Sequence, residues 1–455
     1  MVRLSCGLCA VTAALVLARC FAAEQTPRAD QAPELVPFGV YWAWEYTEPL
    51  AAYQKLQKWE FVGRQLDLLK KHGVDTIWAT NFPISDLAPM LKACAQRDMH
   101  FLPCCSEIHY DIDWRHDNWS YFDQQLAAIK AQLQQAGPAS KALLGYVLCD
   151  EPRPAALEGM EKLRQKFVAM DPDRPSLAVT MWPTTPAAIE KTKCPVLCTD
   201  LYPFFGPDDP NGPHTPDASR NFYVGNQERF VGLLKGSGRP HWVMFMCFVD
   251  VWGPRKYDER LHVIGLPGSY VHWVCPTEAQ MRWQVWAGLR CGSQGFFCFL
   301  CTAPTPDPKT AQAESPKVDW TNVLVKQPTD AGPAALINCD GTATPQLVAM
   351  GKAFRELAPH RELIRRWELS QEPYAEAAAP LSCASFTDPQ TKDRYVVVTN
   401  DDWTKPAEGT VKLKGPGGTV GDLISGKPFK VTNPADAVSV TLYLPAGGGT
   451  ILGLP

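Results

Sequence analysis

Acidic side chains follow several of the apolar runs in this sequence, at the point where each run ends. Asp150 and Glu151 close one such run, and Pro152 forbids the regular extension of a strand beyond them. Asp200 closes a later run, and Asp250 follows another. Because these acids emerge from an apolar core, their protonation can be tuned by the environment, as acid–base catalysis requires.

The chemistry that such acids suit best is glycoside hydrolysis, which uses one protonated carboxyl group and one ionised carboxylate. We predict that Glu151 is the catalytic acid and that Asp150 orients it or raises its pKa as a neighbouring charge. Asp200 ranks first as the second carboxylate. The alternative is a structural role as a helix N-cap or ion-pair partner, and Asp250 fits that alternative equally well.

Aromatic and polar residues crowd the ends of the same runs. Flat rings can stack on the apolar faces of sugars while carboxylates and amides take the hydroxyl groups, although core packing would also explain many of the rings. The residues that we predict to bind substrate are Trp44, Glu45, Asn81, Glu107, Trp182, Tyr202, Asp250 and Trp252.

Eight short apolar runs alternate with amphipathic helical patterns, which predicts a parallel sheet covered by helices. Eight repeats favour closure into a (β/α)8 TIM barrel over 34–371, which places catalytic groups at the carboxyl ends of its strands. An open doubly wound sheet is the alternative, but the glycine-rich turn that usually follows its first strand is missing. The runs are Phe38–Glu45, Val74–Asn81, His100–Glu107, Ala142–Glu151, Ser176–Trp182, Pro195–Tyr202, His241–Phe248 and Gly295–Thr302.

Two long irregular segments, Phe204–Phe222 and Ala303–Pro333, each follow a predicted strand and should lie over the mouth of the barrel. The last helical pattern covers Thr344–Leu369. Helical patterns are gone near Tyr374, and β-like runs separated by Gly, Pro and Asp turns follow. We therefore predict a small all-β sandwich domain over 372–455.

The first 23 residues read as a cleaved export signal, with Arg3, an apolar run and small residues near Ala22 and Ala23. We expect the mature chain to be periplasmic or extracellular, with no transmembrane segment. The chain of 455 residues has a net charge of −4, which argues against nucleic acid as a partner. The cysteines and histidines show no convincing metal-ligand spacing, so we expect no metal and no cofactor.

Several short sequence motifs occur in a characteristic order along the chain. They are Leu144–Pro152, Thr199–Pro203, Leu336–Pro345, and the pair Asp422–Gly426 and Leu444–Thr450. Together they resemble strand ends, the segment before the last barrel helix and the C-terminal β-domain of clan A glycoside hydrolases. The resemblance is nearest to family 42-like glycosidases.

This resemblance implies that Glu151 is the general acid/base. It also implies a nucleophilic Glu at the end of the seventh strand, but His241–Phe248 contains none and the nearest acid is Asp250. Asp200, Asp250 and Glu107 are the substitutes. An inverting mechanism, a substrate that acts as its own nucleophile, and a barrel without activity stay open.

The sequence thus predicts an exported O-glycoside hydrolase that acts on a neutral oligo- or polysaccharide. The alternative is a degenerate barrel that binds carbohydrate without hydrolysing it.

Overall fold

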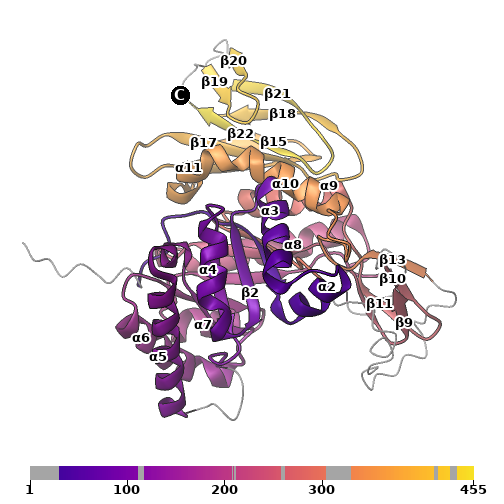
Figure 1. The fold of residues 1–455 in the computed structure, drawn as a ribbon. Helices are drawn as coiled ribbons and strands as arrows, with labels where there is room; N and C mark the ends of the chain where they lie inside the picture. The colour runs from indigo at the N-terminus through magenta and orange to yellow at the C-terminus, as the bar shows by residue number, and fades with distance from the viewer. Residues whose placement is uncertain are drawn as a thin grey trace, which may run out of the picture.

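Eight parallel strands form the centre of the computed structural model, which describes residues 30–110, 117–207, 209, 212–257, 262–303, 329–414, 419–430 and 438–454. The predicted export signal lies outside these residues. The strands run in the order β3-β2-β1-β12-β7-β6-β5-β4. The barrel lies below the C-terminal sheets in the view of Figure 1. Their bounds are β1 Phe38–Ala43, β2 Thr76–Phe82, β3 His100–Cys105, β4 Tyr146–Asp150, β5 Ser176–Thr180, β6 Leu197–Leu201, β7 His241–Met246 and β12 Phe296–Phe299.

The two outer strands of this order, β3 and β4, meet and nearly close the sheet. Phe101 forms a parallel bridge with Leu143, and the backbone N–H of Leu144 donates to the carbonyl of Phe101 at 2.9 Å. Seven of the eight predicted runs contain a barrel strand, and the eighth, Val74–Asn81, covers all of β2 except its last residue, Phe82. The predicted (β/α)8 barrel is therefore confirmed.

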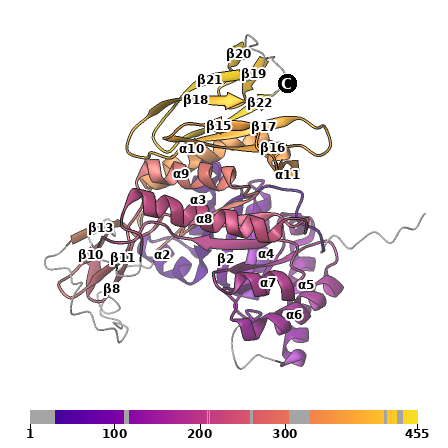
Figure 2. The ribbon, with the colours of Figure 1, turned by 180° about the vertical axis from the view of Figure 1, so that it is seen from behind.

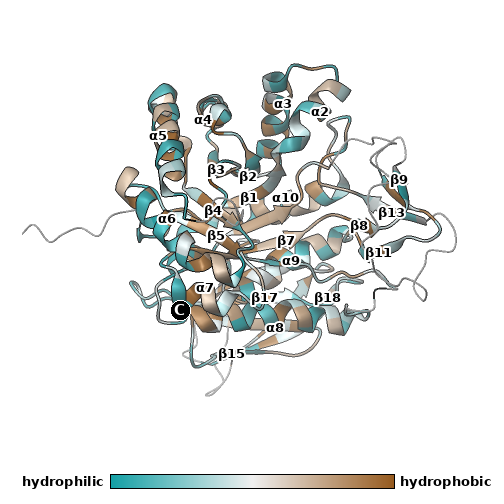
Figure 3. Cartoon of the chain, turned by 90° about the horizontal axis from the view of Figure 1, so that it is seen from below, coloured by the Kyte–Doolittle hydropathy of each residue, from teal (hydrophilic) through white to brown (hydrophobic). Residues whose placement is uncertain are grey.

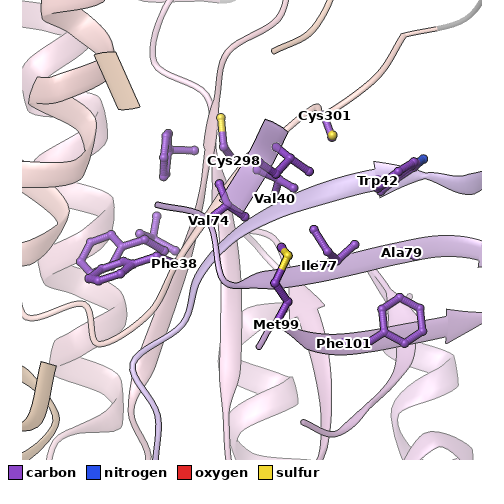
Figure 4. Close-up of a cluster of buried hydrophobic side chains, with 14 of the residues drawn as sticks. Phe38, Val40, Trp42, Val74, Ile77, Ala79, Met99, Phe101, Cys298 and Cys301 are labelled. Carbon is purple, nitrogen blue, oxygen red and sulfur yellow. The ribbon is translucent and has the colours of Figure 1, made fainter. Parts of the chain in front are cut away.

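Side chains on the strands alternate between the barrel interior and the layer under the helices, as successive residues of a strand must. Gly39 makes room inside, because a Cβ atom there would lie 2.3 Å from the ring of Phe297. The interior cluster includes Tyr41, Trp78, Leu102, Val147, Val179, Cys198, Met244 and Phe297. The outer layer, shown in Figure 4, includes Phe38, Val40, Trp42, Ile77, Ala79 and Phe101.

Amphipathic helices cover the barrel, with hydrophilic faces outward and apolar strands at the centre (Figure 3). In α3, Phe61 and Leu66 are buried while Arg64 and Lys70 are exposed, and Gly73 in the left-handed region ends the turn. The helices are α2 Thr47–Tyr53, α3 Lys58–Lys71, α4 Leu87–Ala95, α5 Trp119–Ala136, α6 Leu157–Met170, α7 Thr185–Lys191, α8 Pro216–Leu234, α9 Glu278–Arg290, α10 Pro345–Leu357 and α11 Arg361–Arg366.

Three predictions about this region need correction. Helix α8 begins inside the segment predicted as irregular, because the Thr215 side chain caps its N-terminus and Pro216 takes its first position. The predicted helix over 344–369 is divided, with a 3-10 turn at Ala358–His360 between α10 and α11. Of the predicted loop over 303–333, the last residues form a strand, and 304–328 lie outside the described residues.

A small β-structure is inserted between β7 and α9 and was not predicted. It consists of β8 Asp250–Trp252, β9 Arg255–Tyr257, β10 His262–Gly265 and β11 Tyr270–Trp273, and β13 Thr329–Pro333 joins it later in the chain. Strands β13, β10 and β9 form one antiparallel sheet, and β8 pairs with β11. Val249, Val251 and Val263 form its buried core. These five strands, called the inserted sheet below, stand together at one side of the barrel (Figure 1).

Antiparallel strands at the C-terminus form two sheets, as the predicted sandwich requires. The larger sheet has the order β14-β16-β17-β22-β19-β20, and β15, β18 and β21 form the smaller. The strands are β14 Glu368–Leu369, β15 Ala375–Ala377, β16 Leu381–Thr387, β17 Arg394–Asn400, β18 Ala407–Leu413, β19 Thr419–Asp422, β20 Pro428–Lys430, β21 Val438–Leu444 and β22 Gly449–Leu454.

The sandwich packs on α9 and α10, along the side of the barrel (Figure 2). The indole N–H of Trp283 on α9 donates to Asp401 at 3.0 Å, and Arg290 pairs with the same carboxylate at 3.3 Å. The Trp283 ring also lies 4.8 Å from that of Trp403. These contacts tie the two parts of the chain together.

Candidate active site

A cavity of about 490 Å³ opens where the barrel strands end at their carboxyl side. Barrel enzymes place their reacting groups at this end. The cavity is lined by Tyr41, Asp150, Glu151, Val179, Asp200, Tyr202, Met244, Phe248, Val249, Asp250, Val251, Arg255, Val263, Trp273, Phe299, Leu300, Ala303 and Ala334.

A bulge in β4 points Asp150 into the barrel. Val147 pairs with Leu177 of β5, but one extra residue on β4 shifts the register so that Asp150 pairs with Val179. Without this shift the side chain of Asp150 would face the helices, because each step along a strand reverses the face.

The carboxylate of Asp150 is held from the opposite side of the barrel. The Tyr41 hydroxyl donates to Oδ2 of Asp150 at 2.7 Å. The backbone N–H of Asp150 donates to Nε2 of His109 at 3.1 Å. Burial raises the pKa of Asp150 to about 6; the Tyr41 hydrogen bond lowers this pKa, while the charge of Glu151 raises it. Asp150 is therefore an acid that changes charge near neutral pH.

Glu151 stands at the turn that leaves β4. Its φ of 50° lies in the left-handed region, which is uncommon for a residue with a side chain and is typical of functional sites. Its backbone N–H donates to Val179 at 3.2 Å, and its side chain is exposed at the cavity.

Asp200 reaches the cavity from β6 and follows Cys198 on the inner face of that strand. Its carboxyl group is hydrogen-bonded to that of Glu151, and among the described residues its buried Oδ1 has no hydrogen-bond partner. Burial raises the pKa of Asp200 well above its usual range, and the hydrogen bond and charge of Glu151 raise it further. Burial and the neighbouring Glu151 therefore favour the protonated form of Asp200.

Asp250, the first residue of β8 in the inserted sheet, lines the cavity. The indole N–H of Trp252 donates to its Oδ2. Burial raises the pKa of Asp250, while the Trp252 hydrogen bond and the positive charges of His272 and Arg255 oppose that rise.

Aromatic side chains form one wall of the cavity. Tyr202 follows β6, and its ring centroid lies 5.3 Å from Phe248 and 5.4 Å from Trp273. Phe299 at the end of β12 lies 5.0 Å from Phe248. Such a wall offers apolar faces beside the carboxyl groups, which is the composition of a site for a polar ring with apolar faces.

Some of the predicted substrate-binding residues lie outside the cavity lining. The ring of Trp44 packs 4.7 Å from Phe82, and its indole N–H donates to Asp86 at 2.9 Å, so this residue belongs to the packing under the helices. Glu45 and Asn81 are exposed and bond each other at 3.0 Å.

Three further predicted residues also lie outside the cavity lining, and their side chains contact other residues of the protein. Glu107 accepts the backbone N–H of Ile84 at 3.1 Å. The Trp182 ring lies 3.3 Å from the guanidinium carbon of Arg229 on α8. Trp252 does not line the cavity but holds Asp250, which does. Of the predicted site residues, the structure brings Asp150, Glu151, Asp200, Tyr202 and Asp250 together.

The sequence-based prediction missed several cavity residues. Tyr41 could have been found, because alternate residues of a strand share one face and Tyr41 is an inward-facing residue near the end of β1. Trp273 and Arg255 come from the inserted sheet, whose short strands give no clear periodic signal. Phe299 could not be assigned to the cavity without knowing how β12 ends.

The described residues include neither a group of metal ligands nor a membrane-spanning helix. Within these ranges, no three histidine, cysteine, aspartate or glutamate side chains converge in the way that metal ligands would. No helix there combines the length and apolar character needed to cross a bilayer.

No protein-family profile and no curated protein sequence matches the chain. Solved structures do match it. A catalytic mutant of Gan42B, a GH42 β-galactosidase from G. stearothermophilus, has a TM-score of 0.53 and 8% identity, over 93% of this chain and 99% of that chain. The noncanonic maltogenic α-amylase AmyB from Thermotoga neapolitana has a TM-score of 0.50 and 10% identity, over 92% and 98% of the two chains.

At such low identity the similarity concerns the fold. Together with the strand order and the C-terminal sheets, it confirms the predicted architecture. The chain folds as a glycoside hydrolase-like (β/α)8 barrel followed by a β-domain.

Proposed function

We propose that this protein is a glycoside hydrolase that cleaves O-glycosidic bonds, with Glu151 as the residue that protonates the leaving oxygen. The observation that carries the proposal is the meeting of Asp150, Glu151, Asp200 and Asp250 in one cavity at the carboxyl end of the barrel. The glycosidase folds of the structural neighbours support it.

Glu151 suits the proton donor because it is the accessible member of a pair that retains a proton. Asp200 lies deeper, and burial favours its neutral form. The proton that the pair holds can pass through the hydrogen bond to Glu151 and then to a glycosidic oxygen in the cavity. Asp150 adds negative charge behind the pair, which favours retention of that proton.

The substrate that we propose is a neutral oligo- or polysaccharide. An aromatic wall formed by Tyr202, Phe248, Trp273 and Phe299 faces the acids, and acidic groups outnumber the single base, Arg255, among the described lining residues. We also propose that the chain is exported, on the basis of its first 23 residues.

The test is hydrolysis of 4-nitrophenyl glycosides of neutral hexoses in both anomeric configurations, together with matching oligosaccharides. We expect Glu151→Gln to lower kcat on an accepted oligosaccharide by at least about 100-fold, because an amide cannot donate the proton. The loss should be smaller on 4-nitrophenyl glycosides, whose leaving group needs little protonation.

The matched control is Glu158→Gln, an exposed glutamate in the same βα unit. Its kcat should equal that of the unmodified protein, and both variants should melt within a few degrees of it. Unchanged turnover of oligosaccharides by Glu151→Gln would remove this residue from the mechanism.

A second candidate function is carbohydrate binding without hydrolysis. The observation that favours it is the end of β7, where Met246 and Cys247 stand in place of a carboxylate. Saturable glycan binding in calorimetry, with no product from any glycoside of the panel, would select this function.

A further inference from the structure

Asp200 and Asp250 reach the same cavity from different strands, Asp200 from β6 and Asp250 from β8. The charges that act on Asp200 are those of Glu151 and Asp150, whereas the charges that act on Asp250 are those of His272 and Arg255. The two carboxyl groups therefore have charges of opposite sign around them within one cavity.

The surroundings of Asp250 favour its ionised form far more than those of Asp200. Asp250 accepts the indole N–H of Trp252, and the cavity-lining Arg255 and nearby His272 provide positive charge. The charges that raise the pKa of Asp200 are those of Glu151 and Asp150, and its buried Oδ1 has no hydrogen-bond partner among the described residues. Groups whose environments differ in this way are suited to opposite acid–base roles.

A contact between His272 and Asp209 ties the inserted sheet to the segment that follows β6. Nδ1 of His272 on β11 lies 2.5 Å from Oδ2 of Asp209, in the segment after β6, and that carboxylate is fully buried. The His272 ring lies 4.5 Å from the Trp252 ring. The backbone N–H of Gly206 also donates to the carbonyl of His272 at 2.9 Å. Trp252, which donates to Asp250, therefore packs against a residue that is bonded to the segment after β6.

We propose that Asp250 is the second carboxylate of the reaction and acts as general base on the attacking water. This inference rests on the proposed function. It replaces Asp200, which the sequence alone ranks first for that role, and assigns Asp200 to the proton-holding pair. Trp252 is then a positioning residue.

The proposed step is balanced by one water molecule. The water oxygen bonds to the anomeric carbon while the bond from that carbon to the leaving oxygen breaks. Asp250 takes the proton of the water, and the leaving oxygen takes the proton held by the Glu151–Asp200 pair. Room for a water between base and sugar requires carboxyl groups about 6.5–9.5 Å apart and gives a product of inverted configuration.

The first experiment follows the product by proton NMR, with the unmodified protein and a glycoside it accepts from the 4-nitrophenyl panel. We expect the first-formed sugar to have the anomeric configuration opposite to that of the substrate. Retention of configuration would overturn the role of Asp250 as a base toward water.

The second experiment compares Asp250→Asn with Asp330→Asn, a paired and largely exposed aspartate on β13 of the same inserted sheet. We expect Asp250→Asn to lose at least about 100-fold in kcat, also on 4-nitrophenyl glycosides, because a good leaving group does not replace the base that takes the proton of the attacking water. Asp330→Asn should retain full kcat. Both variants should keep the melting temperature within a few degrees.

The third variant, Trp252→Phe, removes the indole N–H and retains an aromatic ring. We expect roughly a tenfold loss of kcat with unchanged KM, and a shift of the acidic limb of the kcat–pH profile to higher pH. The limb should move up because this hydrogen bond, with His272 and Arg255, stabilises ionised Asp250. A merely structural role would leave the limb in place.

The outcomes separate the two proposals. If the unmodified protein hydrolyses glycosides and Asp250→Asn hydrolyses them equally fast, the assignment of Asp250 fails while the proposed function stands. If the folded, unmodified protein hydrolyses no member of the panel, both fail.

Discussion

At the scale of single residues, the site separates chemically similar groups by their surroundings. Asp150 is anchored by Tyr41, Asp200 shares a hydrogen bond with Glu151, and Asp250 accepts from Trp252. All of them are carboxyl groups at strand ends or just beyond. What distinguishes them is burial and the sign of the neighbouring charges, since these decide which acid retains its proton.

Asp150 should cost the protein stability at neutral and alkaline pH. Its folded-state pKa of about 6 lies above the ordinary 3.8, so the folded protein binds this proton more tightly than the unfolded chain does. The stability that protonation supplies is complete at low pH and is lost as the pH rises through about 6. We expect Asp150→Asn to be more stable than the unmodified protein at pH 8, by at most about 3 kcal/mol.

Urea unfolding at pH 8 and pH 4 measures this difference, which should nearly vanish at pH 4. The exposed Asp98, changed to Asn, is the control and should show no such dependence on pH. A variant that is less stable than the unmodified protein at pH 8 would contradict the prediction.

At the scale of elements, register and close packing decide which side chains reach the cavity. The bulge in β4 turns Asp150 inward, and β6 continues the inward row of Val196 and Cys198 to Asp200. Inside the barrel, Gly39 of β1 lets the Phe297 ring of β12 fill the space where a side chain would be. The interior therefore has no room for additional atoms at that point.

Gly39→Ala should destabilise the barrel by about 1–3 kcal/mol, because its Cβ would lie 2.3 Å from the Phe297 ring. Gly225→Ala on the exposed face of α8 is the matched control. Nothing lies within 4 Å of its added Cβ, so this change should be neutral or stabilise by up to about 1 kcal/mol. Chemical denaturation of both variants measures the contrast, and equal stability of the two would refute it.

At the scale of the whole molecule, the sandwich and the barrel share a buried aromatic contact. Trp403 of the sandwich lies 4.8 Å from Trp283 of α9 and 5.6 Å from Phe204, and Arg220 of α8 lies 5.1 Å above its ring. Because this contact lies outside the cavity lining, we expect it to govern stability and not turnover.

Trp403→Ala should lower the free energy of unfolding by about 3–5 kcal/mol, through lost burial and the cavity that remains. Removal of Tyr443, which is 70% exposed on β21, should change it by less than about 0.5 kcal/mol. Differential scanning calorimetry of Trp403→Ala and Tyr443→Ala compares the two. Similar melting temperatures for both variants would show that the contact does not couple the two parts.

The sequence by itself determined the barrel, the β-domain and the place of the acids. Eight apolar runs with helical patterns between them are compatible with few folds other than the barrel. Strand ends such as Asp150-Glu151 must then lie together at one end of the closed parallel sheet. The order of the motifs also pointed to the glycosidase fold that the structural comparison confirms.

Only the tertiary structure decided which strand-end residues share the cavity. Trp44 and Trp182 look equivalent to Tyr202 in the sequence, yet their rings pack against other elements, since orientation depends on register and on the partners that fold back. The bulge in β4 and the inserted sheet that carries Asp250 arise from long-range pairing, which local periodicity does not encode.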